Sequence, residues 1–331
     1  MRLLVISAPS VYPEKIAETP ELYESFAAYP AFELFHAFPD DLVDEQLQIK
    51  AYPVASSYTY RDFWDWSSQE PVSFSAKHFD LAFCRTLKPF PDGYMDQLAL
   101  LEEELKFVNS PRGILKHLKA DFLPQVAEKW IAPLIVTREI EEASEFFLKH
   151  GEIVAKQTNS CGGKGVWRVR KISAQEYSIE NHYLGSETFP SLQEVFTALF
   201  SKSGDAFQLV QFLKGVDQGD KRVLVVDGEI YGSYLRLSDS GAWVHNISAG
   251  GQYHLAEIDS YERSAIEETA RTYQEMGIHT LGYDFLMGDE GQWQISEINA
   301  GNIAGYSLHE ELTGSLTRKR LCQWIEDFAR R

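Results

Sequence analysis

The stretch "HTLGYDFLMGDEGQWQISEIN", His279–Asn299, predicts two antiparallel strands joined at the turn "GDEG". Reflection about this turn pairs Asp284 with Ile295. That register places Glu297 and Asn299 on the same face as Asp284. Two carboxylates and an amide oxygen form a hard oxygen site that suits Mg²⁺ and its bound phosphates. The alternative, a turn cap and a solvated acid, is less favourable, because an unpaired carboxylate inside "LGYDFLM" is costly to bury.

The composition indicates a globular chain with room for two or three lobes. Its 331 residues are 44% hydrophobic and 24% charged. The 31 Lys and Arg against 49 Asp and Glu give a net charge of −18, which argues against a general nucleic-acid or anionic-membrane binder. No apolar run approaches the ~20 residues that span a bilayer. Small molecules are the expected partners, and the sequence does not decide between a monomer and a homo-oligomer.

The cysteines and histidines do not suggest a thiol or zinc enzyme. Cys84, Cys161 and Cys322 are far apart, as expected for free thiols in a reducing cytoplasm. Cys161 precedes two glycines and could be a nucleophile, but no base that would orient it is visible, so a small loop residue is favoured. The histidines lack zinc-hydrolase spacing. The start "MRLLVISAPS" predicts a strand rather than a signal peptide, so we expect a cytoplasmic protein.

The order of elements predicts a mixed α/β and α+β fold. Strands at Leu3–Ser7, Phe32–Phe38 and Phe79–Arg85, with a helix near Tyr94–Leu105, favour an open, largely parallel sheet. The segment Asp40–Pro71 fits no element and is expected to be a long excursion. Beyond it the strands are mostly antiparallel, with helices between them. Soft domain boundaries are expected near residues 110 and 190.

A glycine-rich loop follows a strand that ends in lysine, in "EIVAKQTNSCGGKGVWRV". Gly162, Gly163 and Gly165 would let backbone N–H groups approach a phosphate, and Lys156 would emerge from the strand beside them. The loop matches neither a Walker loop nor the dinucleotide fingerprint. A plain hairpin loop and a lysine snorkelling at a strand end remain alternatives.

Two arginines lie in neighbouring strands of "KRVLVVDGEIYGSYLRL". The Asp227-Gly228 turn predicts a hairpin, and reflection about it pairs Arg222 with Ser233, which places Arg236 near the same end. Two guanidinium groups close together suit a carboxylate or a phosphoryl group. Alternatively, they pair with the protein's own surface acids. A further glycine turn is expected in "NISAGG", residues 246–251.

The order of these motifs resembles that of prokaryotic glutathione synthetase, within the ATP-grasp superfamily. The resemblance rests on "FVNSPRGI", "LIVTR", "IVAKQTNSCGGKGVWRV", "LVQFLKGVDQGDKRVLVVDGEI", "NISAGG", "LGYDFLMG" and "SEIN". It implies an ATP-grasp fold in three parts. These are an N-terminal open parallel α/β (pre-ATP-grasp) domain over 1–110, a small lid over 111–190, and a C-terminal antiparallel-sheet domain over 191–331.

The resemblance also implies how ATP is held. Lys156 and Lys119 would contact the α-phosphate, with Lys116 competing for the role of Lys119. The glycines of the loop, Gly162, Gly163 and Gly165, would close over the triphosphate. The hinge "VQFL" would hold adenine through backbone groups of Gln211 and Leu213, with Phe212 packing nearby. Asp217 would bind the ribose.

Metal and substrate ligands follow from the same resemblance. Mg²⁺ or Mn²⁺ would be bound by Asp284, Glu297 and Asn299. Arg222 and Arg236 would meet the acid substrate and its activated phosphate.

The implied reaction forms an amide bond. A substrate carboxylate attacks the γ-phosphate of ATP, and an amine then attacks the resulting acyl phosphate. The substrates would be small amino acids or peptides. The chain departs from the family at "AGNIAGY", where a Ser-Pro-Thr-type turn is expected, and at "RTLKPFPD", which lacks an internal acid. A ligase for another amino acid or peptide, an ATP-grasp kinase and a non-catalytic ATP-binding module are therefore the alternatives.

Overall fold

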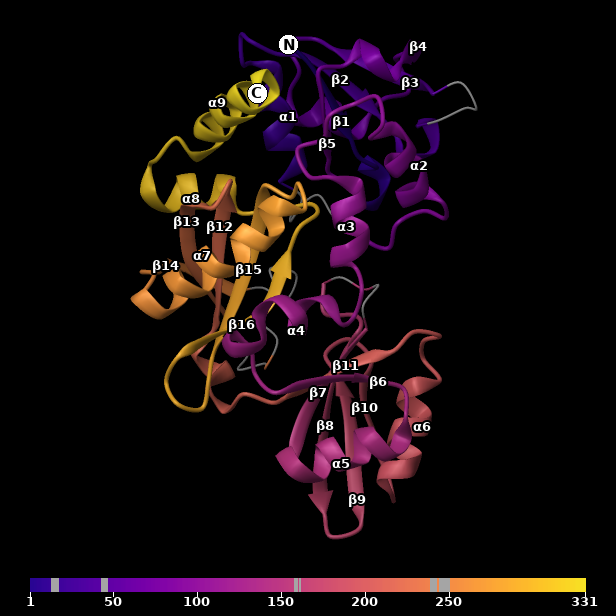
Figure 1. Ribbon diagram of the computed structural model, residues 1–331, viewed down its shortest axis with the longest axis vertical. Coiled ribbons are helices and arrows are strands. Elements are labelled where there is room, and N and C mark those ends of the chain that lie inside the picture. Colours follow the sequence, from indigo (N-terminus) through magenta and orange to yellow (C-terminus); the bar gives the residue numbers. More distant parts are fainter. Residues whose placement is uncertain (13–17, 43–46, 158–159, 161, 239–242, 244–250) are drawn as a thin grey trace.

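The computed structural model describes residues 1–12, 18–42, 47–157, 160, 162–238, 243 and 251–331. These residues form three sheets arranged along the long axis of the molecule (Figure 1). We call them the N-terminal sheet (β1–β5), the lid sheet (β6–β11) and the central sheet (β12–β16). Both termini lie at the end occupied by the N-terminal sheet (Figure 1). No helix within the described ranges is long and apolar enough to cross a membrane.

The N-terminal sheet has a parallel core. β1 (Arg2–Ile6) pairs in parallel with β2 (Glu33–Ala37) and with β5 (Leu81–Cys84). Its centre is apolar on both faces, as expected for a sheet covered on both sides. The covering helices are α1 (Thr19–Ala27) and α2 (Tyr94–Leu101). The parallel sheet predicted from the sequence is therefore present.

The segment that fitted no predicted element extends this sheet. β3 (Gln48–Val54) pairs antiparallel with β2, and β4 (Val72–Ser75) pairs antiparallel with β3. Between them, Tyr58, Phe63 and Trp66 are buried around Tyr23 of α1, with ring centroids 5.2–6.4 Å from its ring. The aromatic residues of this segment thus complete a core, since stacked and edge-on rings bury large areas.

The lid sheet is antiparallel and covered on one face by two helices. Its strand order is β10 (Gly185–Phe189), β9 (Glu176–Asn181), β8 (Val166–Ser173), β7 (Glu152–Gln157), β11 (Phe207–Gln211) and β6 (Leu134–Thr137). α5 (Ile140–His150) and α6 (Leu192–Phe200) share one core with it. Because β11 lies between β7 and β6, we propose that the lid ends after residue 211 rather than near the predicted 190.

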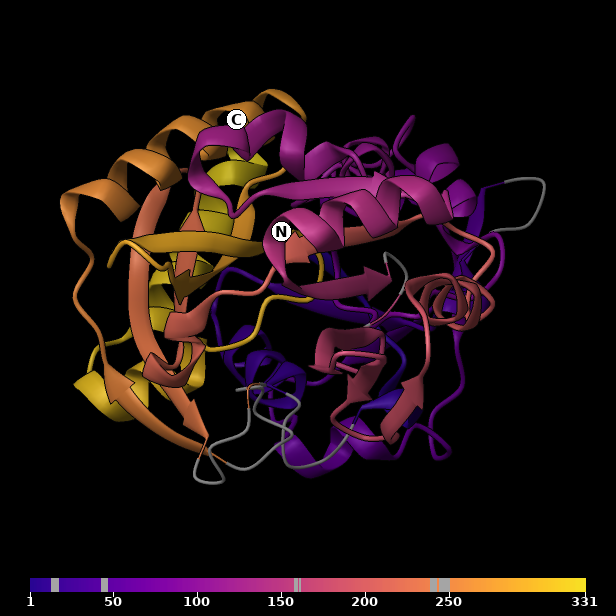
Figure 2. The same ribbon diagram turned by 90° about the horizontal axis from the view of Figure 1, so that it is seen from below.

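The central sheet is antiparallel, in the order β14 (Gly251–Leu255), β13 (Glu229–Ser238), β12 (Asp220–Val226), β15 (Thr280–Met287) and β16 (Trp293–Asn299). α7 (Ser260–Glu275) packs on one face, against Val223 and Val225. α8 (Tyr306–Thr313) and α9 (Thr317–Arg330) follow, and α9 returns to α1 beside the N-terminal sheet (Figure 1). Seen from below, the lid sheet lies in front and the central sheet to its left (Figure 2).

Two predicted registers are wrong, and a bulge contributes to each error. Arg222 pairs with Tyr234 rather than with Ser233, because the ladder shifts between Leu224 and Val225. Asp284 pairs with Glu297 rather than with Ile295 for two reasons. Met287 pairs with Trp293, so reflection about Asp289-Glu290 is already one residue out at the turn, and the β15–β16 ladder shifts by one more between Asp284 and Phe285. A bulge puts one extra residue in one strand, so reflection about the turn misplaces everything beyond it. The two acids are therefore direct cross-strand neighbours.

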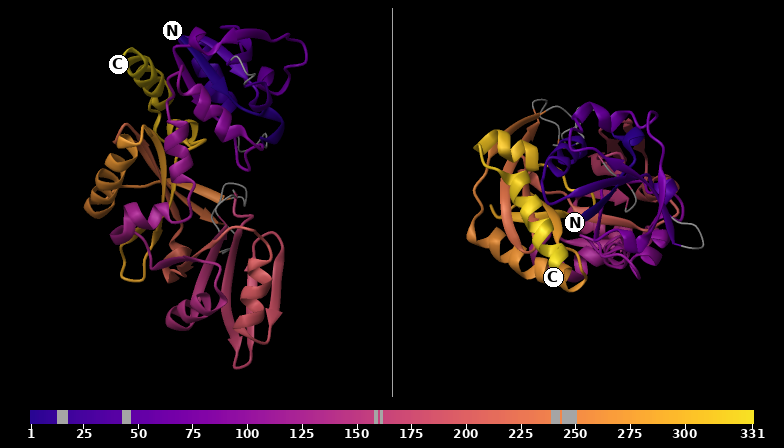
Figure 3. Two further views of the ribbon diagram at one scale, coloured as in Figure 1. Left: turned by 45° about the vertical axis from the view of Figure 1, so that its right-hand side comes forward. Right: turned by 90° about the horizontal axis from the view of Figure 1, so that it is seen from above.

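The linker between the N-terminal and lid sheets runs along the central sheet. It contains α3 (Pro111–His117) and α4 (Phe122–Ala127), with α3 standing between the upper two parts (Figure 3). Asn109 donates to the carbonyls of Thr280 and Ala300 and accepts from the N–H groups of His279 and Thr280. Short 3₁₀ helices lie in the connections: η1 (Pro9–Val11), η2 (Pro39–Asp41), η3 (Tyr60–Trp64), η4 (Ala76–His78), η5 (Glu128–Trp130) and η6 (Lys214–Gln218).

Candidate active site

One face of the central sheet carries four charged side chains that pair with one another. Arg222 donates from Nε to Asp284 Oδ1 at 2.5 Å and from Nη2 to Asp284 Oδ2 at 3.0 Å. Arg236 donates from Nη2 to Asp284 Oδ1 at 2.7 Å and to Asp220 Oδ2 at 2.5 Å. The alternation of β12 and the register of its neighbours bring all four to one face. The sequence-predicted arginines thus meet the predicted metal ligand itself.

This cluster is nearly withdrawn from water, and its charges decide its protonation. Each of the four side chains is at most 13% exposed. Burial opposes ionisation of Asp284, but the positive charges of Arg222 and Arg236 outweigh it and hold the pKa of Asp284 below its usual value. Burial is the largest effect on Asp220 and raises its pKa to about 6, against the attraction of Arg236. Of the two aspartates, Asp284 is therefore the one that stays ionised to lower pH.

Asn299 and Glu297 lie beside Asp284 on the same face. The side chain of Asn299 donates from Nδ2 to Asp284 Oδ2 at 3.1 Å. Glu297 is paired with Asp284 across β15 and β16, and its side chain is exposed. The structure thus brings together the three predicted metal ligands. Within the described ranges, however, no group of three or more His, Cys, Asp or Glu side chains is spaced to hold a metal ion.

The oxygen atoms present fit a divalent metal in part. The exposed carboxylate of Glu297 and the side-chain oxygen of Asn299 are hard ligands of the kind that Mg²⁺ takes. The carboxylate of Asp284 offers about four lone pairs, and four hydrogen bonds from Arg222, Arg236 and Asn299 are directed at it. Asp284 can therefore bind a metal only when one of these donors leaves.

Lys156 of the lid reaches the strand that carries Glu297. Ile153 and Ala155 of β7 face the lid core, so Lys156 lies on the opposite face, as the alternation predicts. Its Nζ donates to the carbonyl of Ser296 in β16 at 3.0 Å. A lysine from the lid and two candidate metal ligands from the central sheet therefore lie at one junction.

The predicted glycine loop connects β7 to β8. Gly162 and Gly163 have φ of 64° and 79°, a conformation that glycine adopts without strain. A Cβ on Gly165 would lie 2.4 Å from the Cβ of Ser160, so only glycine fits there. Cys161 and residues 246–250 of the "NISAGG" motif lie outside the described residues.

The structure distinguishes between the two candidate lysines of the linker. Lys119 lines an open cleft of about 510 Å³ together with Phe90, Met95 and residues 118–121 and 205–206. Lys116 is exposed on α3 and does not line this cleft. Lys119 follows α3 rather than lying within it, and its contact with a phosphate stays a prediction.

The predicted adenine hinge connects β11 to η6. The N–H of Gln211 donates to the carbonyl of Pro133 at 2.9 Å, so this donor is already paired. The ring of Phe212 packs under the guanidinium of Arg168, at 4.1 Å from its centroid, and Leu213 is buried. Asp217 is exposed in η6. The contacts of these residues with adenine and ribose stay predictions.

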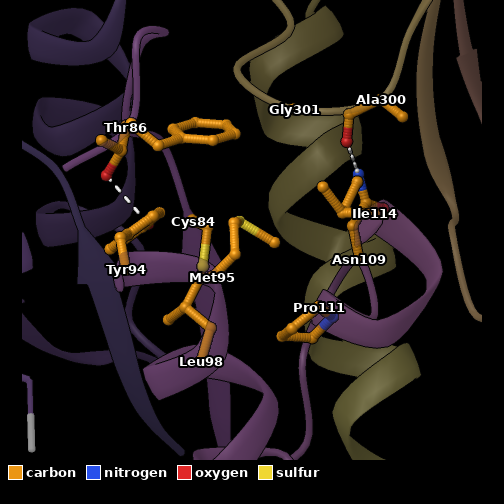
Figure 4. Close-up of a pocket in the computed structure, with 11 residues that line it drawn as sticks. Cys84, Thr86, Tyr94, Met95, Leu98, Asn109, Pro111, Ile114, Ala300 and Gly301 are labelled. Carbon is orange, nitrogen blue, oxygen red and sulfur yellow. Dashed lines mark hydrogen bonds between the residues drawn. The ribbon is translucent and has the colours of Figure 1, made fainter. Parts of the chain in front are cut away.

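A small apolar pocket lies next to Asn299 in the chain. It has a volume of about 30 Å³, and its wall joins the end of β5, α2, α3 and the turn at Ala300 and Gly301 (Figure 4). The polar groups in the wall bond to one another: Tyr94 to Thr86 at 2.9 Å, and Asn109 to the carbonyl of Ala300 at 2.7 Å. The pocket therefore presents mainly carbon and sulfur atoms.

Sequence reasoning missed three buried charges around this site. Asp220 lies two residues before Arg222, so strand alternation alone could have placed it on the charged face. Glu18 and Arg85 are 8% and 1% exposed and contact the segment after Asn299. Arg85 is the first residue of the motif "RTLKPFPD", whereas Glu18 lies in no motif.

Comparison with known proteins agrees with this geometry. The family model for the ATP-grasp domain of prokaryotic glutathione synthetase matches residues 121–307. Glutathione synthetase of Neisseria meningitidis serogroup B is 24% identical over 319 residues, which cover 92% of each chain. The fold resembles D-cycloserine synthetase DcsG, with a TM-score of 0.66 and 13% identity over 99% of this chain and 100% of that one. It also resembles the ATP-grasp ligase PsnB, with a TM-score of 0.62 and 15% identity over 98% of both chains.

These findings confirm the predicted ATP-grasp fold, with its α/β N-terminal part and its antiparallel lid and central sheets. The matching family model spans more than half of the chain and includes the strands that carry Lys156, Arg222, Arg236, Asp284 and Glu297. The chain therefore belongs to the prokaryotic glutathione synthetase family.

Proposed function

We propose that the chain is a carboxylate–amine ligase that joins an acid to an amine through an acyl phosphate, with release of ADP and phosphate. Its family and its glutathione synthetase relatives make it an ATP-dependent enzyme that forms amide bonds. The acyl-phosphate route, ADP as product and the roles of individual residues belong to the proposal. The observation that carries it is the charged face of the central sheet, together with Lys156, which reaches strand β16 from the lid.

The arginines would act on the acid substrate. A carboxylate oxygen of the acid attacks the γ-phosphorus of ATP, the bond to the bridging oxygen breaks, and ADP leaves. The amine nitrogen then attacks the acyl carbon, phosphate leaves and the nitrogen gives up a proton. Arg222 and Arg236 can hold the carboxylate and stabilise the oxyanion. The Nε of Arg236 is buried and has no hydrogen-bond partner among the described residues, so one donor of this cluster is unused.

The remaining groups would act on the phosphates. Lys156 from the lid and Lys119 from the linker would neutralise phosphate charge. A divalent metal, Mg²⁺ or Mn²⁺, held by Glu297 and Asn299 would act as a Lewis acid on phosphate oxygens. Gly162, Gly163 and Gly165 would let the lid backbone close and exclude the water that hydrolyses an acyl phosphate.

The test is a phosphate-release screen of acids crossed with amines, read by product mass. It includes γ-glutamylcysteine with glycine, because the relatives are glutathione synthetases. We expect ADP and phosphate only when both an acid and an amine are present, and a product mass that corresponds to an amide. A phosphorylated acceptor formed without amine would indicate a kinase instead. Tight ATP binding without turnover on any pair would indicate a binding module.

A further inference from the structure

The segment that follows Asn299 is held by three charged side chains. We call residues 303–307 the clamped segment. The carbonyl of Ile303 accepts from Arg85 Nη1 at 2.7 Å, and the carbonyl of Ala304 accepts from Arg222 Nη1 at 3.4 Å. The N–H groups of Gly305 and Ser307 both donate to the carboxylate of Glu18. Four backbone groups of this segment are thus each bound to an ionic side chain.

Glu18 does for α8 what a capping residue normally does, but from a distant part of the chain. Gly305 and Ser307 lie at the start of α8, where backbone N–H groups have no partner within the helix. Glu18 stands directly before α1, and its carboxylate accepts two of these N–H groups. A carboxylate at this end of a helix is also favoured by the helix dipole.

Arg85 provides the opposite charge in the same buried place. Burial raises the pKa of Glu18, while the N–H of Ser307 and the positive charge of Arg85 oppose that rise. Burying one charge alone would be costly, and the attraction between the two offsets part of that cost. Two residues from the N-terminal part of the chain, Glu18 and Arg85, therefore contribute opposite charges to the clamped segment, which follows Asn299.

The backbone of the clamped segment leaves little freedom to move. Gly305 has φ of 124°, and a Cβ added there would lie 2.3 Å from the hydroxyl oxygen of Tyr234. Ile303 and Tyr306 are at most 1% exposed. A shift of Ala304 would therefore require Gly305 and its neighbours to move with it.

We propose that Glu18 and Arg85 are positioning residues that fix the clamped segment, and through the carbonyl of Ala304 fix the guanidinium of Arg222. This inference rests on the proposed function for the role of Arg222 in the reaction. Neither Glu18 nor Arg85 needs to touch the substrate. Orientation errors of about 1 Å at a catalytic group can cost on the order of 100-fold in rate.

The first experiment needs no substrate. Amide hydrogen exchange is measured on the full chain for the wild type, for Glu18→Gln and for Arg85→Lys. We expect exchange at Gly305 and Ser307 to become at least about tenfold faster in Glu18→Gln, because the acceptor loses its charge. Glu33→Gln is the matched control, since Glu33 is exposed and its side chain pairs with the exposed Arg2. Unchanged exchange at both amides in Glu18→Gln would overturn the proposal.

The second experiment asks whether the two residues act through Arg222. Each variant is combined with Arg222→Lys, and kcat and KM for ATP are measured. Glu18→Gln alone should lower kcat about 10- to 100-fold with KM for ATP within about twofold. In the Arg222→Lys background, the same change should cost less than about threefold, because the group that it positions has already been altered. Full additivity of the two losses would overturn the proposal.

A second variant covers the case in which Glu18→Gln does not fold. Arg85→Lys keeps the positive charge beside Glu18 but loses the planar fork that reaches Ile303, and it should give the same split of kcat against KM. Failure of the ligase proposal is distinguishable from failure of this one. Absence of ADP formation by the wild type would remove the ligase, whereas the exchange at Gly305 and Ser307 would still decide whether the clamp exists.

Discussion

The charged face of the central sheet and the inner face of the lid sheet solve different problems with similar residues. On the central face, Arg222, Arg236, Asp220 and Asp284 are buried and bound to one another. On the lid face, Lys156 is half-buried and donates to one backbone carbonyl of the other sheet. The central face is ordered by its own ion pairs before any ligand arrives, while the lid face offers a charge that can change partners. Substitutions in the buried cluster of the central face should therefore affect stability and activity together, and those on the lid face activity alone.

The largest effect is expected from Asp284→Asn. Loss of this carboxylate leaves two buried arginines without their shared partner, which should cost about 3–5 kcal/mol of stability. Activity in the phosphate-release assay should fall at least about 1,000-fold, as expected when charge stabilisation in an active site is lost. Thermal unfolding followed by circular dichroism, beside the kinetic assay, measures both. An unchanged melting temperature would contradict the claim that the buried ion pairs of the central face stabilise the fold.

Glu297→Gln is the matched case on an exposed carboxylate. Glu297 pairs with Asp284 across the strands, but its side chain is exposed. We expect activity to fall about 100-fold while stability changes by less than about 0.5 kcal/mol, as for other exposed positions. The readout is the same pair of assays, with Mg²⁺ titrated to detect a raised metal requirement. Wild-type activity at low Mg²⁺ would rule out Glu297 as a metal ligand.

Lys156→Met tests the lid face. Its bond to the carbonyl of Ser296 contributes little, so the melting temperature should stay within about 2 °C of the wild type. The dissociation constant for ATP should rise about 10- to 100-fold, because a charge-assisted phosphate contact is lost. Displacement of a fluorescent nucleotide measures this constant without the second substrate. A large loss of stability here would show that both faces are built alike.

A smaller effect separates the two linker lysines. Lys119 lines the open cleft and Lys116 does not, although both are exposed. Lys119→Met should weaken ATP binding about tenfold, the cost of one partly solvated charge contact, and Lys116→Met less than about twofold. The same nucleotide displacement assay compares them directly. The reverse order would indicate that Lys116 on α3, and not Lys119, contacts the phosphate.

A further effect is a pH dependence of stability that arises from Asp220. Its pKa is raised to about 6 in the folded protein by burial, above the value of 3.8 for a free aspartate. Between these two values the folded state binds more protons than the unfolded state, so the contribution of Asp220 to stability falls as pH rises from about 4 to about 6. Asp220→Asn should remove this slope. Denaturant unfolding at pH 4.5 and pH 6.5 in both proteins measures it, and identical slopes would contradict the pKa assignment.

Much of the fold could be predicted because strand alternation and turn residues are local signals. The Asp227-Gly228 hairpin and the sequence of strands and helices depend on neighbouring residues only. The registers could not be predicted, since a bulge is invisible to reflection about a turn. The structure of the segment over residues 40–71 could not be predicted for another reason. Its aromatic residues are buried only because they pack around Tyr23, which lies in a distant part of the chain.

The site divides along the same line. Arg222, Arg236, Asp284, Glu297 and Asn299 were found because each lies on a strand near a turn and carries a charge or an amide. The ion pairs among them were not foreseen, and they change the expected chemistry of Asp284 from a free metal ligand to a shared one. Glu18 could not be found at all, because its partners lie 287 and 289 residues away in the chain.

The place where the chain enters and leaves the lid sheet has a consequence for how the protein can be taken apart. The carbonyl of Pro133, directly before β6, accepts from the N–H of Gln211, the last residue of β11, at 2.9 Å. Leu134 and Val210 are paired in register beside them. The chain therefore enters and leaves the lid through two adjacent, hydrogen-bonded strands, β6 and β11. Because the two ends are one hydrogen bond apart, a linker of a few residues suffices to excise the lid genetically or to graft another in its place.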